Sequence, residues 1–171
     1  MLWIITDTHF GHTNIIKLCG RPRDYEDQIL KSWKDNVRPN DTIIHLGDIR
    51  FGKGSNHWDY GIKELPGIKI LIKGNHDRES NRRYTEELGW ALIVEALQLK
   101  TEWGQLLITH RPATAGNWDI NLHGHCHNGG ETIDDGRKRI LFALEYDGYR
   151  VQILNQFLQR KMKNAKGKQN H

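Results

Sequence analysis

Short motifs of potential metal ligands follow apolar runs along this chain, and this arrangement constrains its fold more than any other feature. The motifs are Asp7-Thr8-His9, Gly47-Asp48, Gly74-Asn75-His76-Asp77, Thr109-His110 and Gly124-His125-Cys126-His127. The first four follow runs of apolar or β-branched residues at 2–6, 42–46, 68–72 and 106–109. Such runs predict buried strands. Side chains just past the carboxyl ends of parallel strands converge on the crevice where open α/β sheets bind their ligands.

The side chains in these motifs offer oxygen and imidazole donors. The candidate ligands are Asp7, His9, Asp48, Asn75, His110, His125 and His127. This donor set suits Mn²⁺, Fe, Ni²⁺ or Zn²⁺, and we expect Mn²⁺ first. The ligands are too many for one ion, so the set predicts two divalent ions, about 3.5–4 Å apart, that share one carboxylate.

Each motif taken alone has a structural explanation. Asp48 could be a turn aspartate, Asn75 a turn asparagine and His110 a hydrogen-bonded core histidine. The occurrence of all the motifs in one chain favours the metal site.

In this order, the motifs D-x-H, G-D, G-N-H-D, a single H and G-H-x-H resemble those of the calcineurin-like metallophosphoesterases. The resemblance implies an α/β fold in which a two-sheet β-sandwich is flanked by helices, with a dinuclear metal site at the carboxyl ends of the strands. It also implies the division of the ligands. Asp7, His9 and His127 would hold the first ion, Asn75, His110 and His125 the second, and Asp48 would bridge both.

Further segments resemble a small bacterial and phage-type branch of predicted phosphoesterases that lack a cap domain. They are residues 6–16, the Arg21-Pro22 pair and residues 45–48, and the likeness extends to about residue 155. Protein Ser/Thr phosphatases carry G-D-x-x-D-R-G, whereas residues 47–53 lack the second aspartate. We therefore do not expect a protein phosphatase.

The resemblance implies a chemistry in which a hydroxide that bridges the metals attacks phosphorus. Metal coordination lowers the pKa of water from about 15.7 toward about 7. His76 adjoins a candidate ligand, and the corresponding histidine of the family acts on the leaving group, so we expect it to be the general acid. Arg50, Arg78 and Arg111 lie near candidate ligands and could bind phosphate oxygens, or could be solvated surface charges.

The expected function is a metal-dependent phosphohydrolase. A chain of 171 residues predicts one domain without a cap, and an open site favours phosphodiesters over monoesters. Nucleotide-derived or cyclic phosphodiesters are the first substrate class, and nucleic-acid ends are the second. The alternatives are a phosphomonoesterase or nucleotidase and, from another class, a non-catalytic scaffold that binds metal and a protein partner. Loss of His76 or of several ligands would mark such a scaffold, and none is missing.

The net charge of +4 comes from the end of the chain, because five of the 25 basic residues lie between Arg160 and Lys168. Without them, 20 basic residues face 21 acidic ones. We expect one domain over residues 1–159 and a disordered basic tail over 160–171, which is either a solubilising end or an arm for nucleic acid.

The remaining expectations concern location and helices. Two distant cysteines, Cys19 and Cys126, and a strand that begins at residue 2 favour a reduced, cytoplasmic setting without a signal peptide. No apolar run approaches the roughly 18 residues of a membrane span. Helices are predicted near residues 24–37, 58–65, 81–88 and 153–162, and the second half otherwise contains short apolar runs at 92–99, 105–109, 120–122, 140–144 and 149–154.

Overall fold

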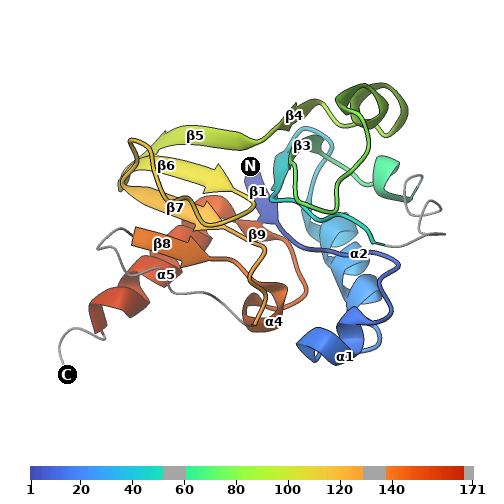
Figure 1. Cartoon of the computed structure of the whole chain (residues 1–171), viewed down its shortest axis with the longest axis horizontal. Coiled ribbons are helices and arrows are strands. Elements are labelled where there is room, and N and C mark those ends of the chain that lie inside the picture. Colours follow the sequence, from blue (N-terminus) through green and yellow to red (C-terminus); the bar gives the residue numbers. More distant parts are fainter. Residues whose placement is uncertain (52–60, 129–137, 168–171) are drawn as a thin grey trace.

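Two β-sheets form the body of the protein in a computed structural model that describes residues 1–51, 61–128 and 138–167 (Figure 1). One sheet has five strands in the order β4-β3-β2-β1-β9, and the other has four in the order β5-β6-β7-β8. The strands are β1 (Leu2–Ile5), β2 (Thr42–His45), β3 (Ile68–Ile72), β4 (Leu92–Val94), β5 (Ala96–Thr101), β6 (Gly104–Thr109), β7 (Ile120–His123), β8 (Lys138–Leu141) and β9 (Gln152–Ile153). The helices are α1 (Ile15–Cys19), α2 (Tyr25–Asn36), the π-helical turn η1 (Arg83–Glu87), α4 (Leu144–Asp147) and α5 (Leu154–Gly167).

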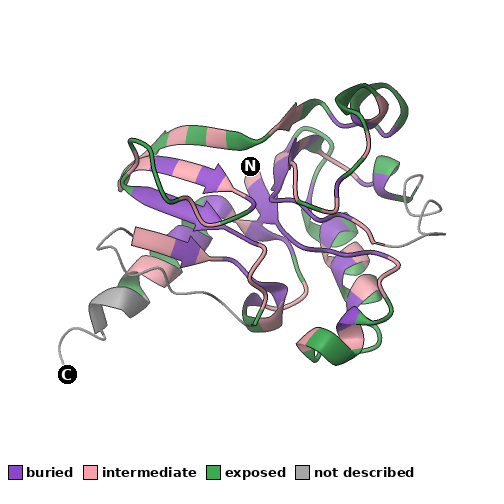
Figure 2. Cartoon of the chain, in the orientation of Figure 1, coloured by how far each residue is buried: buried purple, intermediate pink, exposed green. Residues whose placement is uncertain are grey.

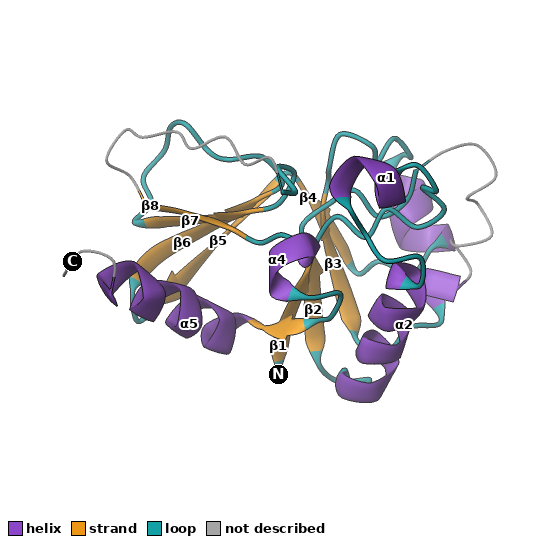
Figure 3. Cartoon of the chain, turned by 90° about the horizontal axis from the view of Figure 1, so that it is seen from below, coloured by secondary structure: helices purple, strands orange, loops and turns teal. Residues whose placement is uncertain are grey.

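The five-stranded sheet confirms the strands expected in the first half. β1, β2 and β3 pair in parallel, β4 continues the sheet in parallel, and β9 closes the other edge antiparallel to β1. Figure 3 shows α1 and α2 on one side of this sheet and the four-stranded sheet on the other. Because both faces are covered, Ile4, Ile44 and Leu71 are fully or almost fully buried, which explains the continuous apolar runs.

The four-stranded sheet combines an antiparallel hairpin, β5 with β6, and parallel pairing of β6 with β7 and β7 with β8. One core cluster joins the two sheets, because it contains Ile4 of β1 as well as Leu106 of β6, Leu122 of β7 and Phe157 of α5. Figure 2 shows that β1 of one sheet and β7 of the other are mostly buried. The two-sheet architecture flanked by helices is therefore confirmed.

Several elements differ from the sequence prediction. The expected single run at 92–99 divides at Glu95 into β4, which pairs with β3, and β5, which pairs with β6, so the chain crosses from one sheet to the other there. The run at 140–144 ends as a strand at Leu141. The short helices α1 and α4 were not expected.

The helix α5 continues to Gly167 and corrects the expected start of the tail at residue 160. Arg160 and Lys161 contact the buried carboxylate of Asp147 at 3.3 and 2.9 Å, and both cations lie over the ring of Phe157. A buried carboxylate requires such partners, so these two cations belong to the folded body. Residues 168–171 lie outside the described residues.

The remaining predicted helices are found in part. Residues 61–63 are helical, while the beginning of the helix expected at 58–65 falls outside the described residues. Residues 81–87 are helical and end in η1. Within the described part of the chain, no helix has the length and apolar character needed to cross a membrane.

Candidate metal centre

The candidate ligands all follow the carboxyl ends of strands, from both sheets. Asp7 and His9 follow β1, Asp48 follows β2, Asn75 follows β3, His110 follows β6, and His125 and His127 follow β7. Backbone hydrogen bonds tie the loops together. The amide of Asp7 donates to the carbonyl of Gly47 at 2.9 Å, and the amide of Gly124 donates to the carbonyl of His110 at 3.0 Å. The loops that carry the motifs therefore form one rim.

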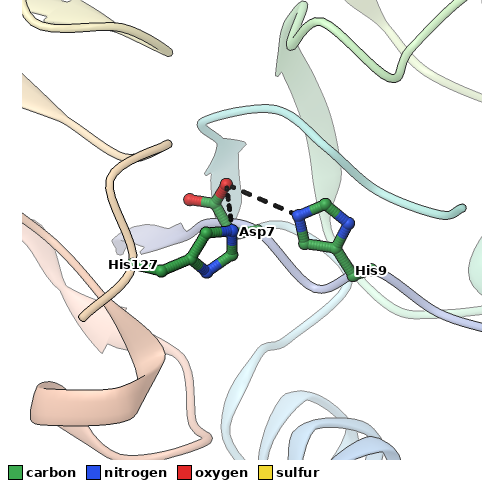
Figure 4. Close-up of side chains that lie close together, drawn as sticks. All are labelled: Asp7, His9 and His127. Carbon is green, nitrogen blue, oxygen red and sulfur yellow. Dashed lines mark ion pairs between the residues drawn. The ribbon is translucent and has the colours of Figure 1, made fainter. Parts of the chain in front are cut away.

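Asp7, His9 and His127 form the first cluster (Figure 4). Oδ1 of Asp7 lies 3.9 Å from Nε2 of His9 and 3.8 Å from Nε2 of His127. Figure 4 shows both rings turned toward this carboxylate oxygen. The three atoms could therefore coordinate one ion.

Three buried atoms of the first cluster lack the partners that a structural role would provide. Oδ1 of Asp7 and both ring nitrogens of His9 are buried without a hydrogen-bond partner. Burial raises the pKa of Asp7, and burial lowers the pKa of His9 to about 2, so this imidazole is neutral. Because unpaired buried polar groups are costly, these residues fit a divalent cation.

Asp48, His110 and His125 form the second cluster. Oδ2 of Asp48 lies 3.4 Å from Nε2 of His110, and the ring centroids of His110 and His125 are 4.9 Å apart. The amide oxygen of Asn75 lies 3.1 Å from the same Nε2. Burial alone would raise the pKa of Asp48, but its hydrogen bond and ion pair with His110 hold the pKa below the usual value.

The carboxylate of Asp48 faces both clusters. Its Oδ2 lies 3.6 Å from Nε2 of His9 in the first cluster, in addition to its approach to His110 in the second. A single oxygen of Asp48 thus approaches a histidine of each cluster, so Asp48 has the position of a shared ligand.

Hydrogen bonds select the ring nitrogen that each of two histidines presents to the centre. Nδ1 of His110 lies 2.8 Å from the carbonyl oxygen of Leu46, which only accepts, so Nδ1 carries a proton and Nε2 is the nitrogen that faces the centre. Nδ1 of His127 similarly faces Oε1 of Glu145 at 3.1 Å. Metal-binding histidines have such partners on the nitrogen that does not bind the ion.

The backbone of the centre is strained. Five non-glycine residues in the described part of the chain have positive φ, and all are candidate ligands: Asp7, His9, Asp48, His125 and His127. The left-handed conformation costs such residues on the order of 1–3 kcal/mol each, and strain of this kind clusters at functional sites. Its coincidence with the candidate ligands supports a functional role for this rim.

The glycine of the G-H-x-H motif is explained by close approach. A Cβ atom on Gly124 would overlap Oγ1 of Thr6 and Oδ2 of Asp7. The next amide, that of His125, donates to the same Oδ2 at 3.0 Å. The small residue thus lets the last motif dock on the first.

Asp77 holds two motifs together, a role that the sequence did not reveal. Its Oδ2 accepts from the amides of Asp48 and Gly74, each at 2.8 Å, and its Oδ1 accepts from the amide of Ile49 at 3.0 Å. Asp77 is buried and faces backbone donors, so it fixes the loop geometry and is not a ligand. Its position in the G-N-H-D motif was the available signal.

His76 lies at the exposed edge of the centre. Its side chain is 29% exposed, and its Nε2 is 3.8 Å from Oδ2 of Asp48. The backbone amide of His76 donates to Oδ1 of Asp48 at 2.8 Å, which fixes the position of the ring's attachment. The ring packs edge-on against Phe51, with centroids 4.6 Å apart.

The three candidate arginines have different surroundings. Arg111 is exposed and donates to the amide oxygen of Asn75 at 3.3 Å, so it adjoins the second cluster. Arg50 is half-buried and donates to Glu79 at 2.8 Å. Arg78 is exposed and directly follows Asp77. Arg111 therefore contacts a candidate ligand.

Comparison with known proteins decides the family. A sequence model of the calcineurin-like phosphoesterases matches residues 1–164. The chain belongs to this family. It is thus a metal-dependent phosphoesterase, and the clusters of histidine and aspartate are where divalent ions could bind.

Two relatives match over most of their length and one over a part of it. The uncharacterized protein MJ1445 of Methanocaldococcus jannaschii is 28% identical over 167 residues, which cover 90% of this phosphoesterase and 87% of the relative. The gene 66 protein of Mycobacterium phage L5 is 38% identical over 80 residues, or 44% of this chain and 39% of the relative. The crystal structure of AQ665 from Aquifex aeolicus, a protein of unknown function, superposes with a TM-score of 0.77 at 26% identity, covering 93% of this chain and 98% of that one.

Proposed function

We propose that this phosphoesterase hydrolyses phosphodiesters, with nucleotide-derived and cyclic diesters as its first substrates, at a centre of two divalent ions. The observation that carries the proposal is the position of the Asp48 carboxylate, which faces His9 in the first cluster and His110 in the second. Asp7, His9 and His127 would hold one ion, Asn75, His110 and His125 the other, and Asp48 both. Mn²⁺ is the first candidate for this mixture of carboxylate, amide and imidazole donors.

Bound divalent ions would supply activation of water and neutralisation of charge on the phosphoryl group. The chain's own residues do the rest. His76 is the general acid that gives a proton to the leaving oxygen, a role supported by a ring that adjoins Asp48 and is 29% exposed toward incoming substrate. Arg111, next to Asn75, contributes charge-assisted hydrogen bonds to a phosphoryl oxygen.

The exposure of the rim supports diesters over monoesters. Asn75 and Arg111 are exposed and His76 is partly exposed, so a second ester substituent can extend from phosphorus toward solvent. Phe51, which packs against His76, and His12 are partly exposed, and the ring centroids of Phe51 and His12 are 4.1 Å apart. Aromatic side chains of this kind stack on nucleobases, at about 1–3 kcal/mol per base, which favours nucleotide-derived esters.

The test is a comparison of two synthetic substrates with Mn²⁺ present, followed by a panel of natural ones. Bis(p-nitrophenyl) phosphate should be hydrolysed faster than p-nitrophenyl phosphate. Among the natural substrates, cyclic nucleotides or dinucleotides should be hydrolysed faster than nucleoside monophosphates and oligonucleotide ends. A preference for monoesters would replace this proposal by a nucleotidase or small-molecule phosphatase. Absence of turnover on the whole panel would favour a non-catalytic scaffold.

A further inference from the structure

Arg21 and Glu145 form a buried ion pair beside the first cluster. Nε of Arg21 donates to Oε1 of Glu145 at 2.8 Å, and the two side chains are 0% and 5% exposed. The guanidinium lies over the rings of Tyr25 and Tyr149, at 5.0 and 5.9 Å from their centroids. Removal of two charges from water is costly, so a gain in stability does not by itself explain such a pair.

Arg21 also holds the backbone of the D-x-H motif. Its Nη2 donates to the carbonyl of Asp7 at 2.8 Å, and its Nη1 donates to the carbonyl of Thr8 at 3.3 Å. The φ angle of Asp7 is +46°, a conformation that the neighbouring structure must enforce. One buried cation therefore links this strained turn to Glu145.

Glu145 connects Arg21 to His127. Its Oε1 accepts from Arg21 and lies 3.1 Å from Nδ1 of His127. The ionised carboxylate has no proton to donate, and it is nearer to Nδ1 than Nη2 of Arg21, which lies 3.3 Å away and donates to the carbonyl of Asp7 at 2.8 Å. Nδ1 of His127 therefore carries a hydrogen that points to Glu145. The other nitrogen, Nε2, then faces Oδ1 of Asp7, 3.8 Å away.

A third metal ion is the competing interpretation of these residues. Cys19, His127 and Glu145 each offer a ligand atom within one small volume. Nη2 of Arg21, however, lies 3.3 Å from Nδ1 of His127, and the same guanidinium forms an ion pair with Glu145. A fixed positive charge at this position repels a cation, so these residues are not a third metal site. Glu145 and Arg21 instead hold His127 in place.

We propose that Glu145 is a positioning residue that keeps His127 in its Nδ1–H tautomer and directs Nε2 to the first ion, while Arg21 fixes both Glu145 and the turn at Asp7. The inference rests on the proposed role of His127 as a ligand. Outer partners of metal-binding histidines typically contribute 10–100-fold to metal affinity, so we expect a loss of roughly this size at the first ion alone.

The test uses the full chain, stripped of metal, with Glu145→Ala as the main variant. Asp147→Asn is the matched control, because Asp147 is a buried carboxylate on the same short helix α4 that pairs with Arg160 and Lys161. Mn²⁺ affinities are measured by calorimetric titration, and His127→Ala marks which ion is the first. The protonated ring nitrogen of His127 is read from ¹⁵N chemical shifts of the metal-free protein.

In Glu145→Ala, the first ion should bind roughly 10–100-fold more weakly and the second should be unchanged. His127 should change from a single Nδ1–H tautomer to a mixture, and Asp147→Asn should match the wild type. If Glu145→Ala does not fold, Glu145→Gln decides, because its amide oxygen still accepts from Nδ1 and should preserve the tautomer with a smaller loss.

Unchanged affinity in the variant, or equal loss of both ions, would overturn the inference, as would the same loss in Asp147→Asn. Failure of the wild-type chain to bind Mn²⁺ would instead contradict the proposed function. In that event the tautomer of His127 still tests the action of Glu145. A mixture in Glu145→Ala alone supports the inference, and identical tautomers in both proteins refute it.

Discussion

Gly74 lies so close to the carboxylate of Asp48 that a Cβ atom at position 74 would overlap Oδ1. The G-N-H-D motif therefore requires its glycine in order to dock on the residue that faces both metal clusters.

Gly74→Ala should displace Asp48 and weaken the binding of both ions, because the added methyl group would overlap the backbone nitrogen and the carboxylate of Asp48. Overpacking of this kind also costs about 1–3 kcal/mol of stability. Mn²⁺ titration and thermal unfolding measure the two effects. Gly61→Ala is the control, because a Cβ there meets nothing within 4 Å. Tight binding of both ions by Gly74→Ala would show that this contact does not set the position of Asp48.

Replacement of His76 should affect substrates according to their leaving group. His76→Ala should lower kcat by roughly 10²–10⁴ on a diester with an alkoxide leaving group, as expected for a lost general acid, and far less on a p-nitrophenyl ester. Steady-state kinetics on a matched pair of esters provide the comparison.

His12→Ala is the matched control for His76→Ala, because His12 is another partly exposed histidine that packs against Phe51. It should show no dependence on the leaving group. Equal losses on both esters in His76→Ala, or release of metal from that variant, would exclude the assigned role.

His45 should make the metal-free protein less stable in acid. It is buried, and it joins two loops because Nδ1 accepts from the amide of Gly47 at 3.1 Å and Nε2 lies 3.0 Å from Oγ1 of Thr8. Burial lowers its pKa from 6.5 to about 3. The unfolded chain therefore takes up this proton first, and the contribution of His45 to stability is lost as the pH falls from 6.5 toward 3.

One such proton changes the unfolding free energy by at most about 1.4 kcal/mol per pH unit. Urea unfolding of the wild type and of His45→Gln, at several pH values between 7 and 4, should show a shallower decline for the variant. Parallel curves would mean that His45 does not titrate in this range.

The strands and the candidate ligands could be predicted because both depend on local patterns. β2 and β3 are continuous apolar runs since both faces of their sheet are covered, and Asp48 and Asn75 follow them within a few residues. Strand direction then brings distant motifs to one rim without further information.

The contacts that depend on the folded chain could not be predicted. Glu145 is 124 residues from Arg21 and lies on a four-residue helix with no strong sequence signal. Arg160 and Lys161 belong to a basic run that is typical of a solvated tail, but Asp147 on α4 binds them. The division of the run at Glu95 depends on which sheet each half joins, and a single apolar pattern does not specify that.

The most direct test of the two-metal centre is the number of ions bound by the wild type and by Asp48→Asn. After loading with Mn²⁺ and removal of free metal, elemental analysis should give about two ions per wild-type chain. Asp48→Asn should retain neither ion tightly, because the carboxylate that faces His9 and His110 is lost. A single ion in the wild type, or two tightly bound ions in Asp48→Asn, would contradict the account.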